Sequence, residues 1–495
     1  LLNALRIHLM DILQRRFYAR MVAEIALRCV YAKDPFFEDQ NKAALFNRYF
    51  DIIIVQKSMP DLLVGGFTVI LQAVVGFTLV SMYHPLFLGF TLVVLFVIWL
   101  IWLAWGGRAI QSSIQVSHKK HATAAWLEGL AASNGFYKSE RHIAEALVHT
   151  DKVTHDYIDR HRRHFSHYFS QSICFMLLYA VATAGLLGLG GWLVIEGELT
   201  LGQLVAAELV LALALLGISN LSTYLSYFYE LCGAVDELSL FYLVDQEQPE
   251  AGYEMLEGDA TLRFIEAQGD ARGHPTTLNF TLPSGSHVLS TVEFRGIQRE
   301  LTSFLKRHDQ PDGGHITLGG QDIAGLRAHH LRQQVMVLDR PHVIEMTIRE
   351  YLQLSAPEVS SKQVREALEA VGLSPAIAQL QNGIDTEIAA TGWPLTITET
   401  MQLKLAAGLI AQPKVLVLGE LYDTMIDTHL RNSFTLLRKH GETTLLYFSN
   451  RPRDLGFDHY LYLGRTEQKL LATVEELCRE SRLELCTTAP VPAGT

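Results

Sequence analysis

The chain has 495 residues, of which 49% are hydrophobic and 19% charged, and its formal net charge is −11. This length exceeds a single hydrophobic core and predicts two or more folding units. The apolar excess excludes an ordinary soluble enzyme, and the acidic balance excludes a dedicated nucleic-acid-binding protein, which needs a basic face. The composition therefore favours a membrane part joined to a soluble part.

Four apolar stretches are long enough to cross a bilayer, which takes about 20 residues. They are residues 62–82, 85–105, 172–195 and 201–221. Short turns join the first to the second and the third to the fourth. Lys and Arg are absent from both turns but frequent before the first stretch and between the second and third. The positive-inside tendency therefore predicts that the long segments are cytoplasmic and that the turns face outward.

Residues 107–170 contain no Pro and are rich in helix-forming residues, which predicts long helices that extend out of the membrane. His161, His164 and His167 share a face of such a helix, and with His149 and His155 they leave a metal site as an alternative. No carboxylate partner is obvious, and a solvated or docking face is the default interpretation. The five cysteines show no metal-ligand spacing.

From about residue 247, Gly and Pro become frequent, and β-rich runs alternate with helical ones. The predicted strands are residues 261–265, 287–292, 334–338, 415–418, 444–448 and 460–463. Predicted helices at 361–370 and 399–411 separate them. This alternation predicts a layered α/β domain.

Three stretches of the second half resemble the nucleotide-binding domain of exporter-type ABC transporters. They are residues 314–323 (GHITLGGQDI), residues 331–337 with 347–350 downstream, and residues 382–392 (NGIDTEIAATG), which resemble the exporters' X-loop and its approach. In the first half, residues 190–202 resemble the turn before the last span of peptide- and protein-exporting members. The resemblance implies a helical transmembrane bundle followed by an α/β P-loop-like ABC domain.

This resemblance also implies a domain plan, in which the four stretches match spans three to six of the family's six. The chain begins at Leu1 without a signal pattern, so we expect that an N-terminal part with the earlier spans is missing. The expected domains are a helix end with the first coupling segment (1–60), a four-span transmembrane domain (61–222), a linker helix (223–250), a degenerate nucleotide-binding domain (251–482) and a disordered tail (483–495). Residues 31–35 and 136–138 would be coupling-helix tips, or ordinary helix-end turns.

Counting back from Gly314 places residues 292–300 at the P-loop of the family. In a P-loop, backbone N–H groups hold the phosphates, a Lys neutralises their charge and a hydroxyl binds Mg²⁺. Gln298 stands at the Lys position and Arg299 at the hydroxyl position, while Glu293 and Glu300 place negative charge where a polyanion would lie. The P-loop-like positions are Val292, Glu293, Gly296 and Gln298. Arg295 or Arg299 is left as an alternative phosphate contact of different geometry.

The other motif positions differ from the family in the same way. After the Walker B strand, Gly419 stands at the Asp position and Glu420 follows. Arg340 matches the Q-loop glutamine, and Asn450 matches the switch histidine. The signature-like positions are Leu395, Thr396, Ile397, Thr398 and Glu399. We expect Ile397 to block a γ-phosphate sterically and Glu399 to repel it.

These positions predict that the chain is not an enzyme, that it has no catalytic residue or metal site, and that it takes no cofactor, neither ATP nor Mg²⁺. The predicted role is a structural, regulatory or assembly component of a membrane complex. The alternative is a transport subunit of an ABC exporter for peptides, proteins or lipids, energised through a partner.

The expected partners are membrane lipid, a second half-transporter in a homodimer or heterodimer, and further subunits of a membrane complex, without nucleic acid. The expected location is the bacterial inner (plasma) membrane, with the nucleotide-binding-like domain in the cytoplasm. The sequence does not predict the substrate, because the residues that line the bundle of an exporter follow no recognisable pattern.

Overall fold

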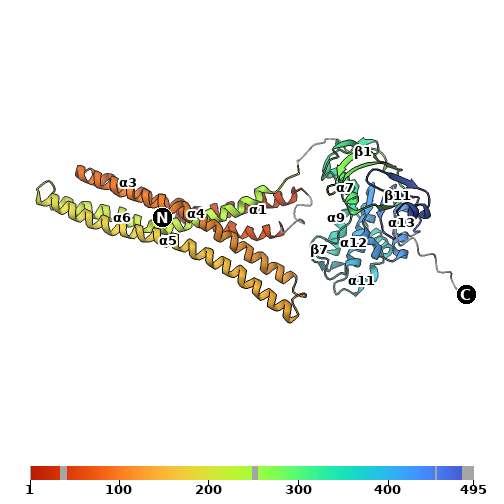
Figure 1. The fold of residues 1–495 in the computed structure, drawn as a ribbon, viewed down its shortest axis with the longest axis horizontal. Helices are drawn as coiled ribbons and strands as arrows, with labels where there is room; N and C mark the ends of the chain where they lie inside the picture. The colour runs from red at the N-terminus through yellow and green to blue at the C-terminus, as the bar shows by residue number, and fades with distance from the viewer. Residues whose placement is uncertain (1, 34–41, 248–254, 452–453, 482–495) are drawn as a thin grey trace. The chain divides into compact units, whose positions relative to one another are not determined.

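The computed structural model describes residues 2–33, 42–247, 255–451 and 454–481 (Figure 1). The chain divides into two compact units, Leu1–Glu247 and Gln248–Thr495. The coupling-helix tip predicted at 31–35 is described only up to residue 33, and the predicted tail at 483–495 lies outside the described residues.

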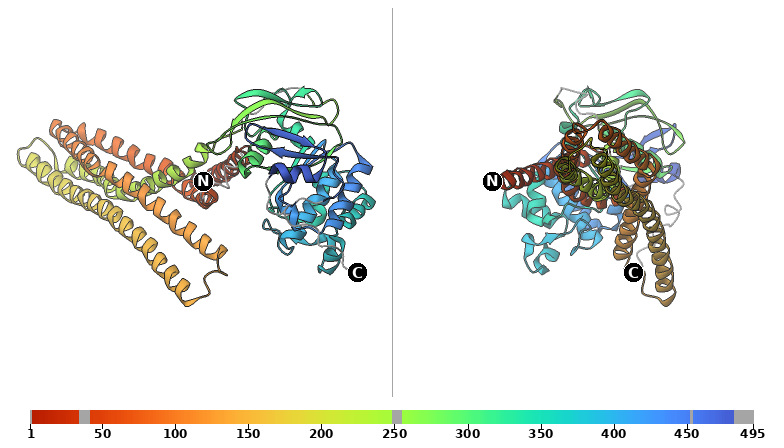
Figure 2. Two further views of the ribbon diagram at one scale, coloured as in Figure 1. Left: turned by 45° about the vertical axis from the view of Figure 1, so that its right-hand side comes forward. Right: turned by 90° about the vertical axis from the view of Figure 1, so that its left-hand side faces the viewer.

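The described residues of the first unit form helices and the short segments that join them, with one isolated bridge between Ala32 and Gln246. Its elements are α1 (Leu2–Val30), η1 (Lys42–Phe50), α2 (Asp51–Pro60), the π-helical η2 (Asp61–Gly66), α3 (Phe67–Ser81), α4 (Pro85–Ala132), α5 (Glu140–Ile195), α6 (Leu201–Ser239) and η3 (Leu240–Leu243). Figures 1 and 2 show α4 and α5 as a long pair that runs beside α3 and α6, and these helices pack on one another. Large apolar side chains that are fully buried between them, such as Phe87, Phe175 and Leu211, form the core of this bundle.

Short polar sequences start the long helices. Pro85 lies in the first turn of α4, where its missing N–H costs nothing, and His84 Nδ1 accepts a hydrogen bond from Leu86 N at 3.2 Å. Ser139 caps α5, and Thr200 caps α6 through a capping box with Gln203. These caps fix the turns between helices, so that consecutive helices run antiparallel.

Among the described residues, three helical stretches are long and apolar enough to cross a membrane: Leu45–Ser81, Pro85–Ala132 and Glu140–Ile195. The second and third predicted spans lie within them, and the first, 62–82, extends one residue beyond Ser81. The predicted fourth span begins α6, whose described apolar stretch, Leu201–Ala212, is shorter. With 48 residues, α4 is about 72 Å long at 1.5 Å per residue. Because this exceeds the hydrocarbon thickness of about 30 Å, α4 extends well beyond a membrane, as predicted.

The second unit contains two larger sheets. Four antiparallel strands follow the order β2 (Pro275–Leu282), β1 (Leu262–Asp270), β4 (Gly313–Leu318), β5 (Gln321–Asp322). Six strands follow the order β12 (Gln468–Leu471), β11 (His459–Leu463), β3 (His287–Val292), β10 (Thr444–Phe448), β9 (Val415–Leu418), β6 (Val335–Leu338). All neighbours in this second sheet are parallel except β12, which is antiparallel to β11. A two-stranded ribbon pairs β7 (Met346–Thr347) with β8 (Glu387–Ile388).

The second unit also contains helices, some of which pack on the parallel sheet and some on one another. They are α7 (Arg295–Leu305), α8 (Ala328–Gln334), α9 (Ile348–Ser355), α10 (Ser361–Ala370), α11 (Ser374–Gln379), α12 (Ile397–Ala411), α13 (Asp427–His440) and α14 (Val474–Ser481), with the short η4 (Gly383–Asp385) and η5 (Glu420–Thr424). Every residue of β9 and β10 is buried, which is typical of central parallel strands. The strands predicted at 287–292, 415–418 and 444–448 and the helix at 361–370 are confirmed to the residue.

Candidate functional site

The carboxyl ends of β3, β6, β9 and β10 lie along one edge of the parallel sheet. In open α/β sheets, ligands bind outside this edge. Glu293 follows β3, Arg340 lies two residues after β6, Gly419 and Glu420 follow β9, and Asn450 lies two residues after β10. The fold therefore brings most of the positions predicted from the P-loop, Walker B, Q-loop and switch comparisons to the same edge.

Only Glu293 and Phe294 connect β3 to α7. Gly296, in the first turn of α7, is buried, and a Cβ there would lie 2.4 Å from Phe294 Cε2, so this glycine makes room for the phenylalanine ring. Gln298 is half-buried and Arg299 exposed, both in the helix. The positions counted as a phosphate loop thus fold largely as the start of a helix.

Arg295 is the cation that contacts the Walker B position. Its Nη2 lies 2.7 Å from Glu420 Oε2, and its side chain is 78% exposed against 18% for Glu420. Glu293 is engaged elsewhere, because its Oε2 accepts a hydrogen bond from Arg465 N at 3.0 Å and its Oε1 lies 3.3 Å from Arg465 Nε. Arg465 therefore balances the charge of Glu293, one of the two carboxylates expected where a polyanion would lie. The other, Glu300, is buried in α7 and accepts a hydrogen bond from Thr276 Oγ1.

Asp339 is a carboxylate at this edge that the sequence comparison did not single out. It follows β6 directly and is half-buried. Gly419 N donates to Leu338 O at 2.9 Å, and a Cβ on Gly419 would lie 3.1 Å from Asp339 Cα. Gly419 stands where the family carries the Walker B aspartate. Because it has no side chain, the Asp339 segment can lie directly against it. An acidic residue directly after a buried strand was the available signal.

Lys404 on α12 holds the segment that contains the Q-loop position. Its Nζ donates to the carbonyl oxygens of Arg340 at 2.6 Å and His342 at 3.0 Å. Burial lowers the pKa of Lys404 to about 8. The backbone around Arg340 is therefore tied to α12, the helix that begins at the signature-like residues.

The switch position is organised by Asp423 in η5. Ser449 Oγ donates to Asp423 Oδ1 at 2.6 Å, and Asn450 N donates to Asp423 Oδ2 at 3.3 Å. Asn450 is thus held beside the segment that follows Glu420. The carboxylate that does this, Asp423, was also missed in the sequence.

The signature-like residues form the start of α12. Thr396 and Glu399 make a capping box: Glu399 N donates to Thr396 Oγ1 at 3.3 Å, and Thr396 N donates to Glu399 Oε2 at 2.8 Å. Leu395 is buried and Thr398 half-buried, whereas the Ile397 side chain is 63% exposed. The Glu399 carboxylate is therefore engaged in capping the N-terminus of α12.

The second and third stretches of the family resemblance meet in the fold. Met346 pairs with Ile388 across the ribbon, and Arg349 binds Asp385 with two contacts, Nε to Oδ1 at 2.6 Å and Nη2 to Oδ2 at 3.1 Å. The Q-loop run and the X-loop approach are thus joined directly.

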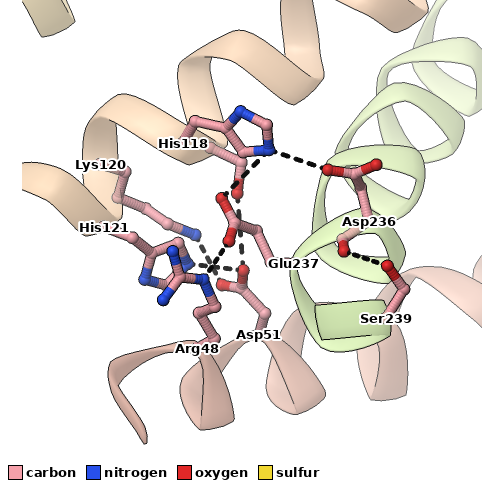
Figure 3. Close-up of polar contacts among 9 residues, drawn as sticks. Arg48, Asp51, His118, Lys120, His121, Asp236, Glu237 and Ser239 are labelled. Carbon is pink, nitrogen blue, oxygen red and sulfur yellow. Dashed lines mark hydrogen bonds and ion pairs between the residues drawn. The ribbon is translucent and has the colours of Figure 1, made fainter. Parts of the chain in front are cut away.

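A second polar site lies in the helical unit and was not predicted (Figure 3). Asp51, 1% exposed, lies with its Oδ1 2.6 Å from Lys120 Nζ and its Oδ2 2.7 Å from His121 Nε2. Glu237 of α6 is fully buried and pairs with Arg48 of η1, and His118 Nε2 lies 2.8 Å from Asp236 Oδ2. This cluster ties η1, α2, α4 and α6 together. Its sequence signal is weak, because each member is an isolated charged residue.

The histidines of the metal alternative have other surroundings. His164 Nδ1 lies 3.0 Å from Ser112 Oγ, and the His149 ring packs on Trp126 with ring centroids 4.1 Å apart. Among the described residues, no group of three His, Cys, Asp or Glu side chains is arranged to hold a metal ion.

Comparison with known proteins agrees with the fold. No profile of a known protein family matches the chain. The chain is 24% identical to the ABC multidrug transporter mdr2 of Aspergillus fumigatus over 462 residues, which are 89% of this chain and 57% of that protein. It is 27% identical to the leukotoxin translocation ATP-binding protein LktB of Mannheimia glucosida over 240 residues, which are 47% of this chain and 34% of that protein. The chain thus spans roughly a third to three-fifths of the length of these relatives.

The same fold occurs in the structure of a bacterial Atm1-family ABC exporter with ATP bound, with a TM-score of 0.84 and 16% identity over all of this chain and 88% of that one. The chain has the fold of an ABC exporter subunit, membrane-spanning helices fused to an α/β domain, as predicted, and it is an integral membrane protein.

Two predictions are wrong by these comparisons. The chain was expected not to be an enzyme and to bind neither ATP nor Mg²⁺, but its relatives are ABC transporter proteins, among them one named as ATP-binding. The expectation was drawn from single motif positions, such as Gln298 and Gly419. The contacts of Arg295 and Asp339 show that charged groups of both signs nevertheless lie at the same sheet edge.

Proposed function

We propose that this chain is a transport subunit of an ABC exporter, which works as a dimer in a membrane and uses ATP with Mg²⁺. The observation that carries this proposal is the match to an ABC exporter structure over the whole chain, both units included. The relatives support it, since similarity to mdr2 extends over 89% of the chain. A structural or regulatory role remains the second candidate.

The groups at the sheet edge fit a nucleoside triphosphate with Mg²⁺. Arg295 and Arg299 supply cations at the first turns of α7, an 11-residue helix whose free N–H groups also attract anions. Asp339 and Glu420 supply carboxylate oxygens, the ligands that Mg²⁺ prefers. When bound, ATP supplies the phosphoryl-transfer chemistry that drives transport. We propose that Arg295 then exchanges its contact with Glu420 for a phosphate oxygen, and that Gln298, Gly419 and Asn450 line the same edge.

The finer aspects of the proposal follow from the sequence. We place the protein in a bacterial inner membrane with its α/β unit in the cytoplasm, paired with a second half-transporter in a homodimer or heterodimer. The substrate class is a peptide, protein or lipid, in keeping with the translocation role in the name of LktB. The domain boundaries given above are part of this proposal.

The test uses the full-length protein, with its partner subunit if it has one, in proteoliposomes. We expect Mg²⁺-dependent photo-crosslinking of an azido-ATP to this chain and ATP-dependent turnover. Arg295→Ala should weaken ATP affinity about tenfold, the equivalent of 1.4 kcal/mol. Glu420→Gln should lower turnover, because its carboxylate lies at the Walker B position.

The matched control is Glu358→Gln, an exposed carboxylate between α9 and α10. It should leave affinity and turnover unchanged. Absence of crosslinking to this chain, or an equal effect of all three substitutions, would count against the proposed ATP site and favour the second candidate.

A further inference from the structure

The charged cluster of Figure 3 belongs to the parts of the helices that extend beyond the predicted membrane spans. Its α4 members, for example, follow the span predicted at 85–105. Its two buried carboxylates, Asp51 of α2 and Glu237 of α6, are 1% and 0% exposed. Burial of charged groups costs free energy, and a buried ion pair often stabilises a fold no better than well-packed apolar side chains would. Stability alone therefore does not account for the cluster.

The contacts of the cluster join α4 to its neighbours. The carboxylate oxygens of Asp51 on α2 lie 2.6 Å from Lys120 Nζ and 2.7 Å from His121 Nε2, both on α4. His118 Nε2, also on α4, lies 2.8 Å from Asp236 Oδ2 on α6. We propose that these contacts form a conformational latch: they hold α4 against α2 and α6 in the arrangement of this structure, and the contacts with Asp51 break in a second arrangement of the helices.

The apolar core around the cluster does not include α4. This core joins α1, η1, α2, α6 and the segment that follows α6, and its buried side chains are Ile25, Leu45, Ile52, Val55, Ala234, Leu238, Phe241 and Val244. Neither these residues nor the partly buried apolar side chains described against them belong to α4. The extension of α4 is bound to α5 instead, with 2.7 Å from Lys119 Nζ to Asp156 Oδ2 and 2.7 Å from Arg160 Nη1 to Gln115 Oε1. The extensions therefore form two bodies, one built on α2 and α6 and the other on α4 and α5, and the cluster connects them.

Glu237 gives the cluster a second way to pair. Its Oε2 accepts a hydrogen bond from Arg48 Nε, but its Oε1 is buried and makes no hydrogen bond with the residues that the structure describes. A buried polar atom without a hydrogen bond is unfavourable. His118 Nε2, which contacts Asp236, lies only 3.8 Å from this oxygen. A small shift of α4 would therefore bring His118 from Asp236 to Glu237, and packed helices move by such exchanges between discrete contacts.

This inference goes beyond the proposed function, and its test measures the helices without turnover. The full-length protein, with its partner subunit if it has one and its natural cysteines replaced by serine, is placed in lipid nanodiscs without nucleotide. Spin labels are attached to Leu27→Cys on α1, an exposed position, and to Gly129→Cys on α4, where a side chain enters open space. In a homodimer the labelled chain is diluted with unlabelled chain. Double electron–electron resonance should give one main distance for the wild type, and Lys120→Met should raise the population at a second, discrete distance about tenfold.

The matched control is Lys119→Met. Lys119 is the neighbour of Lys120 on α4 and has nearly the same side-chain exposure, 37% against 40%, but it pairs with Asp156 within the body of α4 and α5. Its replacement should leave the distances of the wild type unchanged. His121→Leu removes the other partner of Asp51 and should also populate the second distance, so that a folding defect in Lys120→Met does not decide the outcome.

A second discrete distance in Lys120→Met or His121→Leu, with Lys119→Met unchanged, supports the latch. The inference is overturned if neither variant changes the distances, if the distribution only broadens, or if Lys119→Met has the same effect. If the second distance is found but no ATP binds to the chain, the proposed function fails and the latch stands. If ATP-dependent transport is found without a second distance in these variants, the latch alone fails.

Discussion

At the scale of single residues, Asp51 carries the largest predicted effect on stability. Its buried carboxylate contacts both Lys120 and His121. Removal of one partner from a buried ion pair leaves the other uncompensated and costs about 3–5 kcal/mol. We therefore expect Asp51→Asn to lower the free energy of unfolding by about 3 kcal/mol, as measured by denaturant titration in detergent micelles. Asp159→Asn, which breaks the exposed pair with Arg163, should cost less than about 1 kcal/mol. Equal losses would contradict the role given to Asp51.

His287 links the stability of the α/β unit to pH. It is 1% exposed at the start of β3, and burial together with the nearby Arg438 lowers the pKa of its imidazole from 6.5 to about 4. Between these two values the unfolded chain binds a proton that the folded protein does not, so stability falls as the pH falls from 6.5 towards 4. The loss from this group alone is roughly 3 kcal/mol at its full extent. It is measurable as a shift of the unfolding midpoint of the full chain between pH 7 and pH 4.5.

The control for this prediction is His287→Gln. In the wild type, Arg438 Nε donates to His287 Nδ1 at 3.3 Å, and the glutamine keeps a hydrogen-bond acceptor for it. The variant should lose this part of the pH dependence. A wild type and a variant with parallel pH profiles would show that His287 does not titrate as described.

At the scale of elements, the signature-like segment is explained by helix capping. Thr396 closes the N-terminus of α12 through the capping box with Glu399. Loss of such a cap costs about 1 kcal/mol. We expect Thr396→Ala to lower the free energy of unfolding by about this amount and Thr396→Ser to restore it, as measured by thermal unfolding of the full chain. If the serine variant were as unstable as the alanine variant, the hydroxyl would not be acting as a cap.

The elements also show what the sequence could and could not predict. The bounds of β9 and β10 were predicted correctly, because a fully buried strand is a continuous apolar run bounded by polar residues. α7 begins at Arg295, in residues that were expected to form a loop, because motif counting compares positions and does not test helix formation. The polar cluster of Figure 3 could not be predicted, since Arg48 and Glu237 are 189 residues apart and nothing local relates them.

At the scale of the whole molecule, composition and hydrophobic patterning were sufficient for the architecture. The two units follow from the change in composition near residue 247, and the division falls at Glu247 and Gln248. The candidate site could be predicted from the sequence only in part. Its positions at strand ends were predicted from the family resemblance, but the contacts of Asp339, Asp423 and Lys404 depend on how strands and helices from different parts of the chain come together. The prediction that the chain binds no ATP was therefore wrong, because it considered only which residue types stand at the motif positions.

Membrane orientation is the remaining property of the whole molecule that the structure makes testable. Residues 133–139 join the long extensions of α4 and α5, whose flanks are rich in Lys and Arg, whereas the turn before α6 contains neither. Since positively charged loops stay in the cytoplasm, Gly135 should lie inside the cell and Glu196 outside. In a full-length protein with its natural cysteines replaced by serine, a membrane-impermeant maleimide should label Glu196→Cys in intact cells. Gly135→Cys, where a side chain would enter open space, should be labelled only after the membrane is permeabilised. The reverse pattern would place the α/β unit on the far side from cytoplasmic ATP, and it would remove the basis for an ATP-driven cycle.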